Sequence, residues 1–348
     1  MRNPEDAHIF ITDDLEHTFT SLLSKQQFSS IVILVDDNTE KHCLPKVLPI
    51  ISDAHIIRIK HGEEEKTLAT CEKIWNEMTA LQLDRKALLV NLGGGVIGDM
   101  GGFCAATYKR GISFIQVPTT LLSEVDASVG GKLGVDFHQF KNHIGVFQVP
   151  NAVVIHTPFL QTLPFDELRS GYAEVIKHCL IADKAKWDII KSQSIEDQDW
   201  NEIADHSVRI KAHIADVDPL EKGLRKILNF GHTIGHAIES FYLLQEDKKL
   251  LHGEAIAIGM IAEAWLSFKR GFIALAEVEE IKTFILNVYG KVNIPEVDLD
   301  HIIPLTLQDK KNEHNIIQCT LLEEIGKANF NNPIDSTDIR EAIAFYNA

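Results

Sequence analysis

The sequence is short of cysteine and contains no long apolar run. Five cysteines are scattered through 348 residues, and none of them forms a CxxC pair. An odd, dispersed set is typical of reduced, buried thiols. No segment approaches the ~18 consecutive apolar residues that a membrane-spanning helix needs. The opening stretch, MRNPEDAHIF, lacks the basic start and apolar core of a signal peptide. We therefore expect a cytoplasmic protein that does not enter a membrane.

Positive charge is also scarce. The chain has 34 Lys and Arg against 50 Asp and Glu, which gives a formal net charge of −16. This balance argues against a broad surface for nucleic acid or anionic membranes. An acidic chain can still bind an anionic small molecule, provided that it gathers its cations at one place.

Short apolar runs dominate the first part of the chain. They are IVILV (31–35), ALLVNL (87–92), FIQVP (114–118) and AVVIH (152–156). Each run is rich in β-branched residues or Leu, and a helical pattern over 67–83 separates the first two. Strands that alternate with helices favour an α/β domain with a parallel, Rossmann-like sheet.

From about residue 165 onward the pattern becomes helical. Apolar residues recur at helical spacing in segments such as DELRSGYAEVIKHCLIAD and GEAIAIGMIAEAWLSFK, and no clear alternating strand is present. The length of the chain suggests two domains. We predict an α/β domain over residues 1–164 and an all-α domain over residues 165–348.

A glycine-rich stretch, NLGGGVIGDMGG, follows the second predicted strand and precedes a helix. Gly93, Gly95 and Gly98 satisfy GxGxxG, so backbone N–H groups could approach a pyrophosphate there. The acidic residue expected about 20 positions later is missing, because Ser113 occupies that place. Tight helix packing would also explain the glycines. Polar groups near other strand ends favour a nucleotide; they are Asp36, Glu63, Lys66 and the hydroxyls of PTTLLS (118–123).

His232 and His236 are four residues apart and would share one face of a helix. Such a pair can be structural, and the glutamate of HExxH is absent. His252 in LHGEA and Glu174 in AEVIK make a His/His/Glu set available. A set of this kind with open coordination positions suits a catalytic zinc ion.

Several cations lie in or beside glycine-containing segments. Any single lysine could be a solvated surface charge. In a chain of net charge −16, however, cations that converge would serve to bind a phosphate and a carboxylate. The polar residues considered for this cluster are Arg110, Asp126, Lys132, Lys141, Asn142, Glu174, Lys177, Lys211, Arg225, Asn229, Lys310 and His314.

Long stretches of the chain closely resemble the 3-dehydroquinate synthase family. The motifs are LGGGVIGDMGGFCAATYKRG, FIQVPTTLLSEVDASVGGK, KNHIG, LRSGYAEVIKH, LRKILNFGHTIGHAIE, LHGEA and DKK, in this order over about residues 31 to 330. The resemblance implies a sugar phosphate cyclase of the shikimate pathway. Its reaction would convert 3-deoxy-D-arabino-heptulosonate 7-phosphate to 3-dehydroquinate and phosphate. It also implies NAD, a zinc or cobalt ion, and a homodimer.

The resemblance assigns roles by position. Glu174, His232 and His252 would bind the metal, whereas His236 would face the substrate. Arg110 would reach the phosphate pocket of the neighbouring subunit. Two residues depart from the family pattern, Phe140 in place of a glycine and Ala127 in place of a serine. The implied NAD contacts are Asp36, Glu63, Lys66, Gly94, Gly95, Val96, Gly98, Asp99, Thr119, Thr120, Lys132, Lys141 and Thr162. The implied substrate contacts are Asp126, Lys132, Asn142, Lys177, Lys211, Arg225, Asn229, His236 and Lys310.

The chemistry explains why one protein would need all of these groups. Elimination of phosphate requires an acidic C–H bond, which a transient ketone provides. Hydride transfer from a substrate alcohol to NAD makes that ketone and is later reversed. A metal ion bound to the same oxygen favours its alkoxide form before the hydride leaves.

Three alternative functions stay open: another sugar phosphate cyclase, a metal-dependent polyol dehydrogenase, and a non-catalytic nucleotide-binding protein. The dehydrogenase would lack the VDASVGGK loop, and the non-catalytic protein would have lost site residues.

Overall fold

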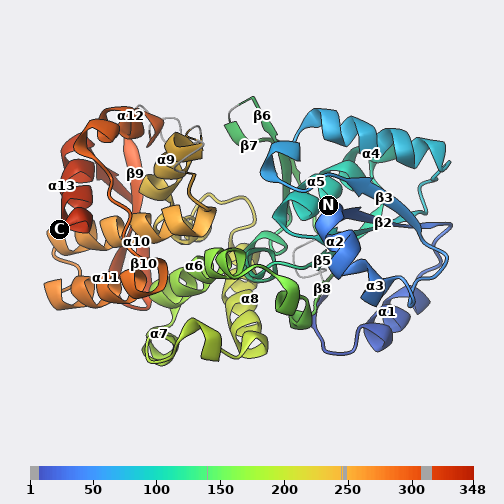
Figure 1. Ribbon diagram of the computed structural model, residues 1–348, viewed down its shortest axis with the longest axis horizontal. Coiled ribbons are helices and arrows are strands. Elements are labelled where there is room, and N and C mark those ends of the chain that lie inside the picture. Colours follow the sequence, from blue (N-terminus) through green and yellow to red (C-terminus); the bar gives the residue numbers. More distant parts are fainter. Residues whose placement is uncertain (1–7, 139, 244, 246–248, 307–315) are drawn as a thin grey trace. The chain divides into compact units, whose positions relative to one another are not determined.

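The computed structural model describes residues 8–138, 140–243, 245, 249–306 and 316–348 (Figure 1). The chain forms two compact units. One comprises residues 1–168 and 200–219, and the other comprises residues 169–199 and 220–348. The sequence had grouped residues 200–219 with the helical segment. They pack in the first unit because Ala204 and Val208 of this helix lie in one core cluster with Val153 and Ile155.

A six-stranded sheet forms the centre of the first unit. All its neighbouring strands run parallel, in the order β1-β8-β5-β4-β2-β3. The four predicted strands are confirmed as the inner ones, and their apolar sequences fit strands that are covered on both faces. The sequence missed the edge strands β1 and β3, whose residues are less buried. The strands are β1 (His8–Ile11), β2 (Ile31–Asp36), β3 (His55–Ile59), β4 (Leu88–Gly93), β5 (Ser113–Pro118) and β8 (Ala152–Ile155).

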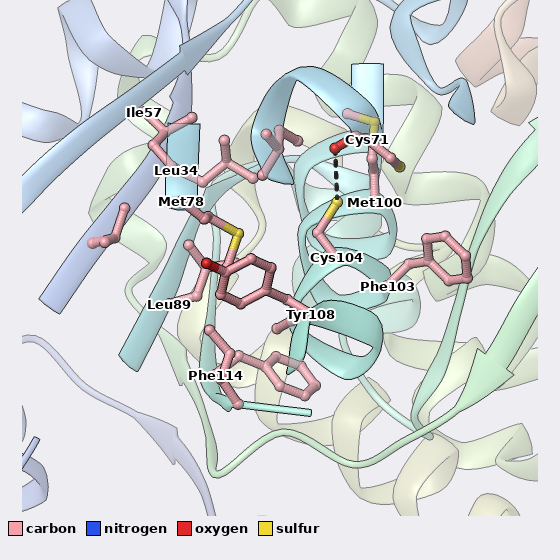
Figure 2. Close-up of a cluster of buried hydrophobic side chains, with 14 of the residues drawn as sticks. Leu34, Ile57, Cys71, Met78, Leu89, Met100, Phe103, Cys104, Tyr108 and Phe114 are labelled. Carbon is pink, nitrogen blue, oxygen red and sulfur yellow. Dashed lines mark hydrogen bonds between the residues drawn. The ribbon is translucent and has the colours of Figure 1, made fainter. Parts of the chain in front are cut away.

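Helices cover both faces of this sheet. Figure 2 shows the cluster in which α4 and α5 contribute Cys71 and Cys104 beside Leu34 and Leu89 of the sheet, with the Cys104 thiol 4.0 Å from the Cys71 carbonyl oxygen. Both thiols are free and buried, as the cysteine distribution predicted. The helices of this unit are α1 (Leu15–Ser24), α2 (Asp37–His42), α3 (Leu44–Val47), α4 (Leu68–Ala80), α5 (Gly95–Thr107) and α8 (Trp200–Val217), and a hairpin pairs β6 (Lys132–Phe137) with β7 (Phe140–Phe147).

The second unit is mostly helical, as predicted, but it is not all-α. An antiparallel hairpin of β9 (Ile317–Glu324) and β10 (Lys327–Ile334) corrects that prediction. The apolar residues of β9 are nearly all buried and do not alternate with polar ones, and β10 is rich in asparagine. Neither strand therefore shows the usual pattern. The helices are α6 (Phe165–Ala182, whose first residues belong to the first unit), α7 (Lys184–Ile190), α9 (His232–Leu243), α10 (His252–Lys269), α11 (Leu275–Tyr289), α12 (Glu296–Thr306) and α13 (Ser336–Asn347).

Helix α10 lies at the core of the second unit and packs against α9, α11, α13 and β9. Its sequence is apolar on nearly every side, which is typical of a buried helix. Even so, the described part of the chain contains no helix that is long and apolar enough to span a membrane.

Candidate active site

Three side chains of the second unit point their donor atoms at one another. Glu174 is fully buried in α6, His232 is the first residue of α9, and His252 is the first residue of α10. The Glu174 Oε1 atom lies 3.3 Å from His232 Nε2 and 3.7 Å from His252 Nε2. Donors about 2.0–2.2 Å from a tetrahedral zinc ion are ~3.3–3.6 Å apart. The spacing of these atoms therefore fits a shared metal ion.

His236 belongs to the same cluster. Its ring centroid lies 4.8 Å from that of His232 and 5.7 Å from that of His252. Donor atoms of the three histidines all lie within 4.8 Å of one another. Both Glu174 and His236 are thus within reach of an ion held by His232 and His252, and the choice between them stays a prediction from the family resemblance.

The second nitrogen of each proposed histidine ligand faces an acceptor. His232 Nδ1 lies 3.0 Å from the Phe230 carbonyl oxygen, and His252 Nδ1 lies 3.2 Å from Glu239 Oε2. When Nδ1 donates, Nε2 carries the lone pair that a metal needs. Sequence reasoning missed Glu239. It could have been found, because it lies seven residues, or two helical turns, after His232.

Burial and neighbouring charges set the ionisation of the three proposed metal ligands. Burial opposes ionisation of Glu174, but Lys177 and His232 outweigh it and hold the pKa of this carboxyl well below its usual range. Burial, together with Lys177, lowers the pKa of His232 to about 4, so its imidazole is neutral. Burial also opposes charge on His252, yet Glu239 and Glu174 raise its pKa to about 9. A metal ion would therefore displace one proton on binding.

In the first unit, the glycine-rich turn joins β4 to α5, as predicted. Strand β4 ends at Gly93 and α5 begins at Gly95. The Thr119 N–H donates to the Gly93 carbonyl oxygen at 3.2 Å, and the Gln116 side chain donates to that of Gly98 at 2.9 Å. Gly93, Gly94, Gly95 and Gly98 line a small, open hollow beside this turn. A helix N-terminus that opens on such a hollow suits a phosphate group.

The strand order places other predicted cofactor residues at the same sheet edge. The chain passes from β2 to β3 on one side of β2, and then to β4 on the other side of β2. The direction of the strand order therefore reverses between β2 and β4. Ligands of α/β sheets bind outside the carboxyl ends of strands at this kind of position. Asp36 ends β2, where its side chain accepts from the Thr39 N–H at 2.7 Å. Thr120 lies against Gly94, 3.0 Å from where a β-carbon would stand.

Two ion pairs join further predicted cofactor residues. Lys66 Nζ lies 2.6 Å from Asp99 Oδ2 on α5, and Lys141 Nζ lies 3.6 Å from Glu63 Oε1. Val96 follows in the first turn of α5 and packs against the core cluster. Thr162 is not among the residues that line the hollow. It lies in a short 3₁₀ helix (Thr157–Thr162), where its hydroxyl donates to the Phe159 carbonyl oxygen at 3.1 Å.

The predicted substrate residues of the first unit differ in their exposure to solvent. Lys211 of α8 is buried and forms an ion pair with Asp126. Lys132 is exposed at the start of β6, after two glycines with positive φ. Asn142 is exposed, and its N–H donates to Asp136 Oδ1 at 2.7 Å. Arg110 is also exposed.

In the second unit, Lys177 and Arg225 are almost fully buried. Lys177 pairs with Glu174, three residues earlier on the same helix. The Asn229 side chain donates to Glu221 Oε1 at 3.0 Å. Lys310 and His314 lie outside the described residues.

Solved structures with this fold define the class. A structure of 2-deoxy-scyllo-inosose synthase with carbaglucose-6-phosphate, NAD⁺ and Co²⁺ is 26% identical, with a TM-score of 0.86 over 96% of this chain and 95% of that chain. ValA, a 2-epi-5-epi-valiolone synthase from Streptomyces hygroscopicus with NAD⁺ and Zn²⁺ bound, shares the fold at 23% identity and a TM-score of 0.87, over 98% of this chain and 96% of that chain. The fold is thus that of the sugar phosphate cyclases.

Sequence comparison identifies the family within this class. The 3-dehydroquinate synthase N-terminal family model matches residues 56–170, and the 3-dehydroquinate synthase C-terminal model matches residues 171–312. A 3-dehydroquinate synthase from Parabacteroides distasonis is 39% identical over 346 residues, which cover 98% of each chain. The chain belongs to the 3-dehydroquinate synthase family.

Proposed function

We propose that this chain converts 3-deoxy-D-arabino-heptulosonate 7-phosphate to 3-dehydroquinate and inorganic phosphate, the reaction of its family. The observation that carries the proposal is the buried donor set of the second unit. Glu174 Oε1 lies 3.3 and 3.7 Å from the two histidine Nε2 atoms, at the spacing of a metal site. A non-catalytic relative would have no need for a buried carboxylate and two oriented imidazoles.

The residues of each unit fit the groups that this reaction needs. The two solved cyclases contain NAD⁺ together with Co²⁺ or Zn²⁺. In this chain, the hollow at Gly93–Gly95 would hold the phosphates of NAD⁺, and Glu174, His232 and His252 would hold the metal ion. When bound, NAD⁺ supplies reversible hydride transfer and the metal supplies Lewis-acid stabilisation of a substrate oxygen.

The cations of the chain would bind the two anionic ends of the substrate. Lys177 and Arg225 are buried, so their charges are poorly screened by water and act strongly on a phosphate or a carboxylate. If the substrate's own phosphate accepts the proton that is lost, the phosphate and that C–H bond must lie close together. Cations that fix the phosphate set this geometry and stabilise its departing charge. The described residues assigned to the substrate are Arg110, Asp126, Lys132, Asn142, Lys177, Lys211, Arg225, Asn229 and His236.

We also propose that the protein acts as a homodimer in the cytoplasm. In support, Arg110 is exposed in a tight turn in which it and Lys109 adopt positive φ values of 69° and 50°. This conformation is uncommon for residues other than glycine and points to a structural demand on the turn. In a dimer, Arg110 would serve the phosphate pocket of the second subunit. Sedimentation of the purified protein measures its oligomeric state, and a monomer with full activity would contradict this assignment.

Removal of the metal tests the proposed function. Purified protein is treated with a chelator, its metal content is verified, and phosphate release from the heptulosonate phosphate is measured. We expect activity to disappear and to return with Zn²⁺ or Co²⁺. Unchanged turnover in verified metal-free protein would contradict the proposal.

The choice of substrate separates this function from that of a related cyclase. The heptulosonate phosphate carries a carboxylate, whereas sedoheptulose 7-phosphate does not. We expect turnover of the first substrate and little or none of the second. Preference for sedoheptulose 7-phosphate would assign the chain to the valiolone type.

A further inference from the structure

Glu263 is an acidic residue in the middle of the apolar helix α10, and its side chain is fully buried. Burying a carboxylate without partners is costly. The residues that it contacts therefore indicate why it stands there.

Both carboxylate oxygens of Glu263 accept hydrogen bonds from the backbone where α9 begins. The Gly231 N–H donates to Oε2 at 2.6 Å, and the Ile234 N–H donates to Oε1 at 3.2 Å. The first N–H groups of a helix have no acceptor within the helix, and the positive end of its dipole favours an anion. A side chain of α10 thus caps α9.

The two backbone N–H groups that Glu263 binds lie on either side of a proposed metal ligand in the sequence. His232 lies between the two donors, Gly231 and Ile234. The helices are also in close backbone contact, because a β-carbon on Gly259 of α10 would lie only 1.9 Å from the Gly231 carbonyl oxygen. The other histidine ligand, His252, is the first residue of α10 itself. Glu263 therefore links the backbone around His232 to the helix that carries His252.

We propose that Glu263 is a positioning residue that holds His232 in register with His252 and so sets the affinity and geometry of the metal site. The inference rests on one part of the proposed function, namely that His232 and His252 bind the metal ion. Glu263 contacts the backbone on either side of His232 and not the His232 ring nitrogens, whose partners are Glu174 and Phe230. Its effect passes through the start of α9, as expected for a residue that orients a ligand.

The test compares Glu263→Gln with the unaltered full chain. Each protein is stripped of metal and titrated with Zn²⁺ in competition with a chromophoric chelator, and the visible spectrum of bound Co²⁺ is recorded. Glutamine keeps the size of the side chain but places an N–H group against a donor. We expect Zn²⁺ to bind about 10–100-fold more weakly and the Co²⁺ spectrum to change.

Ser267→Ala is the matched control, four residues further along α10. The Ser267 hydroxyl donates to the Glu263 carbonyl oxygen at 2.8 Å and accepts from the Leu322 N–H at 3.0 Å, so it joins α10 to β9. Its loss is expected to lower the Tm and to leave the Zn²⁺ affinity and the Co²⁺ spectrum unchanged.

Wild-type Zn²⁺ affinity and Co²⁺ spectrum in Glu263→Gln, with only the Tm lowered, would overturn the proposal. If this variant does not fold, Glu263→Asp replaces it. Aspartate keeps the charge but is one methylene shorter, so weaker Zn²⁺ binding is again expected, and unchanged binding again overturns the proposal. A His252→Ala variant that bound Zn²⁺ like the unaltered chain would instead contradict the metal site itself, whatever the result at Glu263.

Discussion

The two units build their candidate sites by different means. In the first unit, the hollow lies at the carboxyl ends of parallel strands, and four glycines of the β4–α5 turn, which offer only backbone atoms, are among its lining residues. In the second unit, the cluster consists of side chains from three helices, α6, α9 and α10. A site made by backbone leaves a local sequence pattern, whereas a site made by side chains depends on how helices pack. The second kind should therefore respond more strongly to changes at the helix contacts.

Loss of a metal ligand should have the largest effect. We expect His252→Ala to lose its metal and to lower turnover by ~10³-fold, because a metal contributes several kcal/mol and 1.36 kcal/mol corresponds to a factor of ten. His236→Ala should keep the metal and still lose rate. Elemental analysis and phosphate release measure the two properties. If the His236→Ala protein bound no metal, the assignment of ligands would be wrong, and His236 rather than Glu174 would be the third ligand.

Glycine substitutions test the difference between the units directly. A β-carbon on Gly253 would lie 2.0 Å from the Ser170 carbonyl oxygen, where α6 meets α10, so Gly253→Ala should destabilise the protein by about 3 kcal/mol and weaken Zn²⁺ binding. On Gly95 the nearest atom outside its own helix is the Ala127 β-carbon at 3.8 Å. Gly95→Ala should change stability by no more than about 0.5 kcal/mol while weakening NAD⁺ binding at the helix N-terminus.

Thermal unfolding and calorimetric titrations with Zn²⁺ and NAD⁺ measure both glycine variants. Equal destabilisation by the two substitutions would remove the contrast between the units. A normal NAD⁺ affinity in Gly95→Ala would place the dinucleotide phosphates elsewhere.

Lys132 tests the division between cofactor and substrate within the first unit. A hydrogen bond to a charged group contributes about 1.5–3 kcal/mol, so Lys132→Ala should raise KM for the heptulosonate phosphate by roughly 10–100-fold. The NAD⁺ affinity should stay the same. The opposite pattern, with NAD⁺ affinity lost and KM intact, would assign Lys132 to the cofactor.

The smallest effect is expected at Glu124 of the first unit, a buried acid to which no binding or catalytic role is assigned. It is fully buried, and neither carboxyl oxygen has a hydrogen-bond partner among the described residues. Burial raises the pKa of this carboxyl well above its usual value of 4.5. The folded state therefore holds the proton more tightly than the unfolded state, and the stability that this provides is lost as the pH rises above 4.5.

Glu124→Gln should accordingly stabilise the protein at pH 8 by about 1 kcal/mol, or a few degrees in Tm. The gain should shrink as the pH falls toward 4.5. Glu72→Gln, at an exposed position of α4, is the control and should show no such trend. A gain that did not depend on pH would mean that Glu124 is not buried as a neutral acid.

The sequence predicted the parts of the fold that depend on neighbours along the chain. The inner strands and the turn at Gly93–Gly95 were found because apolar runs and glycine spacing are local. The hairpin β9–β10 was missed because its strands do not alternate, and α8 was grouped with the wrong unit because its helical pattern does not say which core its apolar face will join.

The candidate site divides in the same way. Glu174, His232 and His252 were named from motifs, but Glu239 and Glu263 were not. Helical spacing places Glu239 on the same face of α9 as His232, but neither acid shows in the sequence which distant group it will contact. Glu239 meets His252 across 13 residues of chain, and Glu263 meets Gly231 across 32.

By itself, the sequence determined the parallel α/β architecture of the first unit, the glycine turn and the kinds of donor atoms available to a metal. Only the tertiary structure decided which donors meet, which acceptor faces the Nδ1 atom of each proposed histidine ligand, and which carboxylate caps the helix of His232. The reason is physical. Periodicity and backbone freedom act between residues close in sequence, whereas the meeting of α6, α9 and α10 follows from close packing of their buried faces.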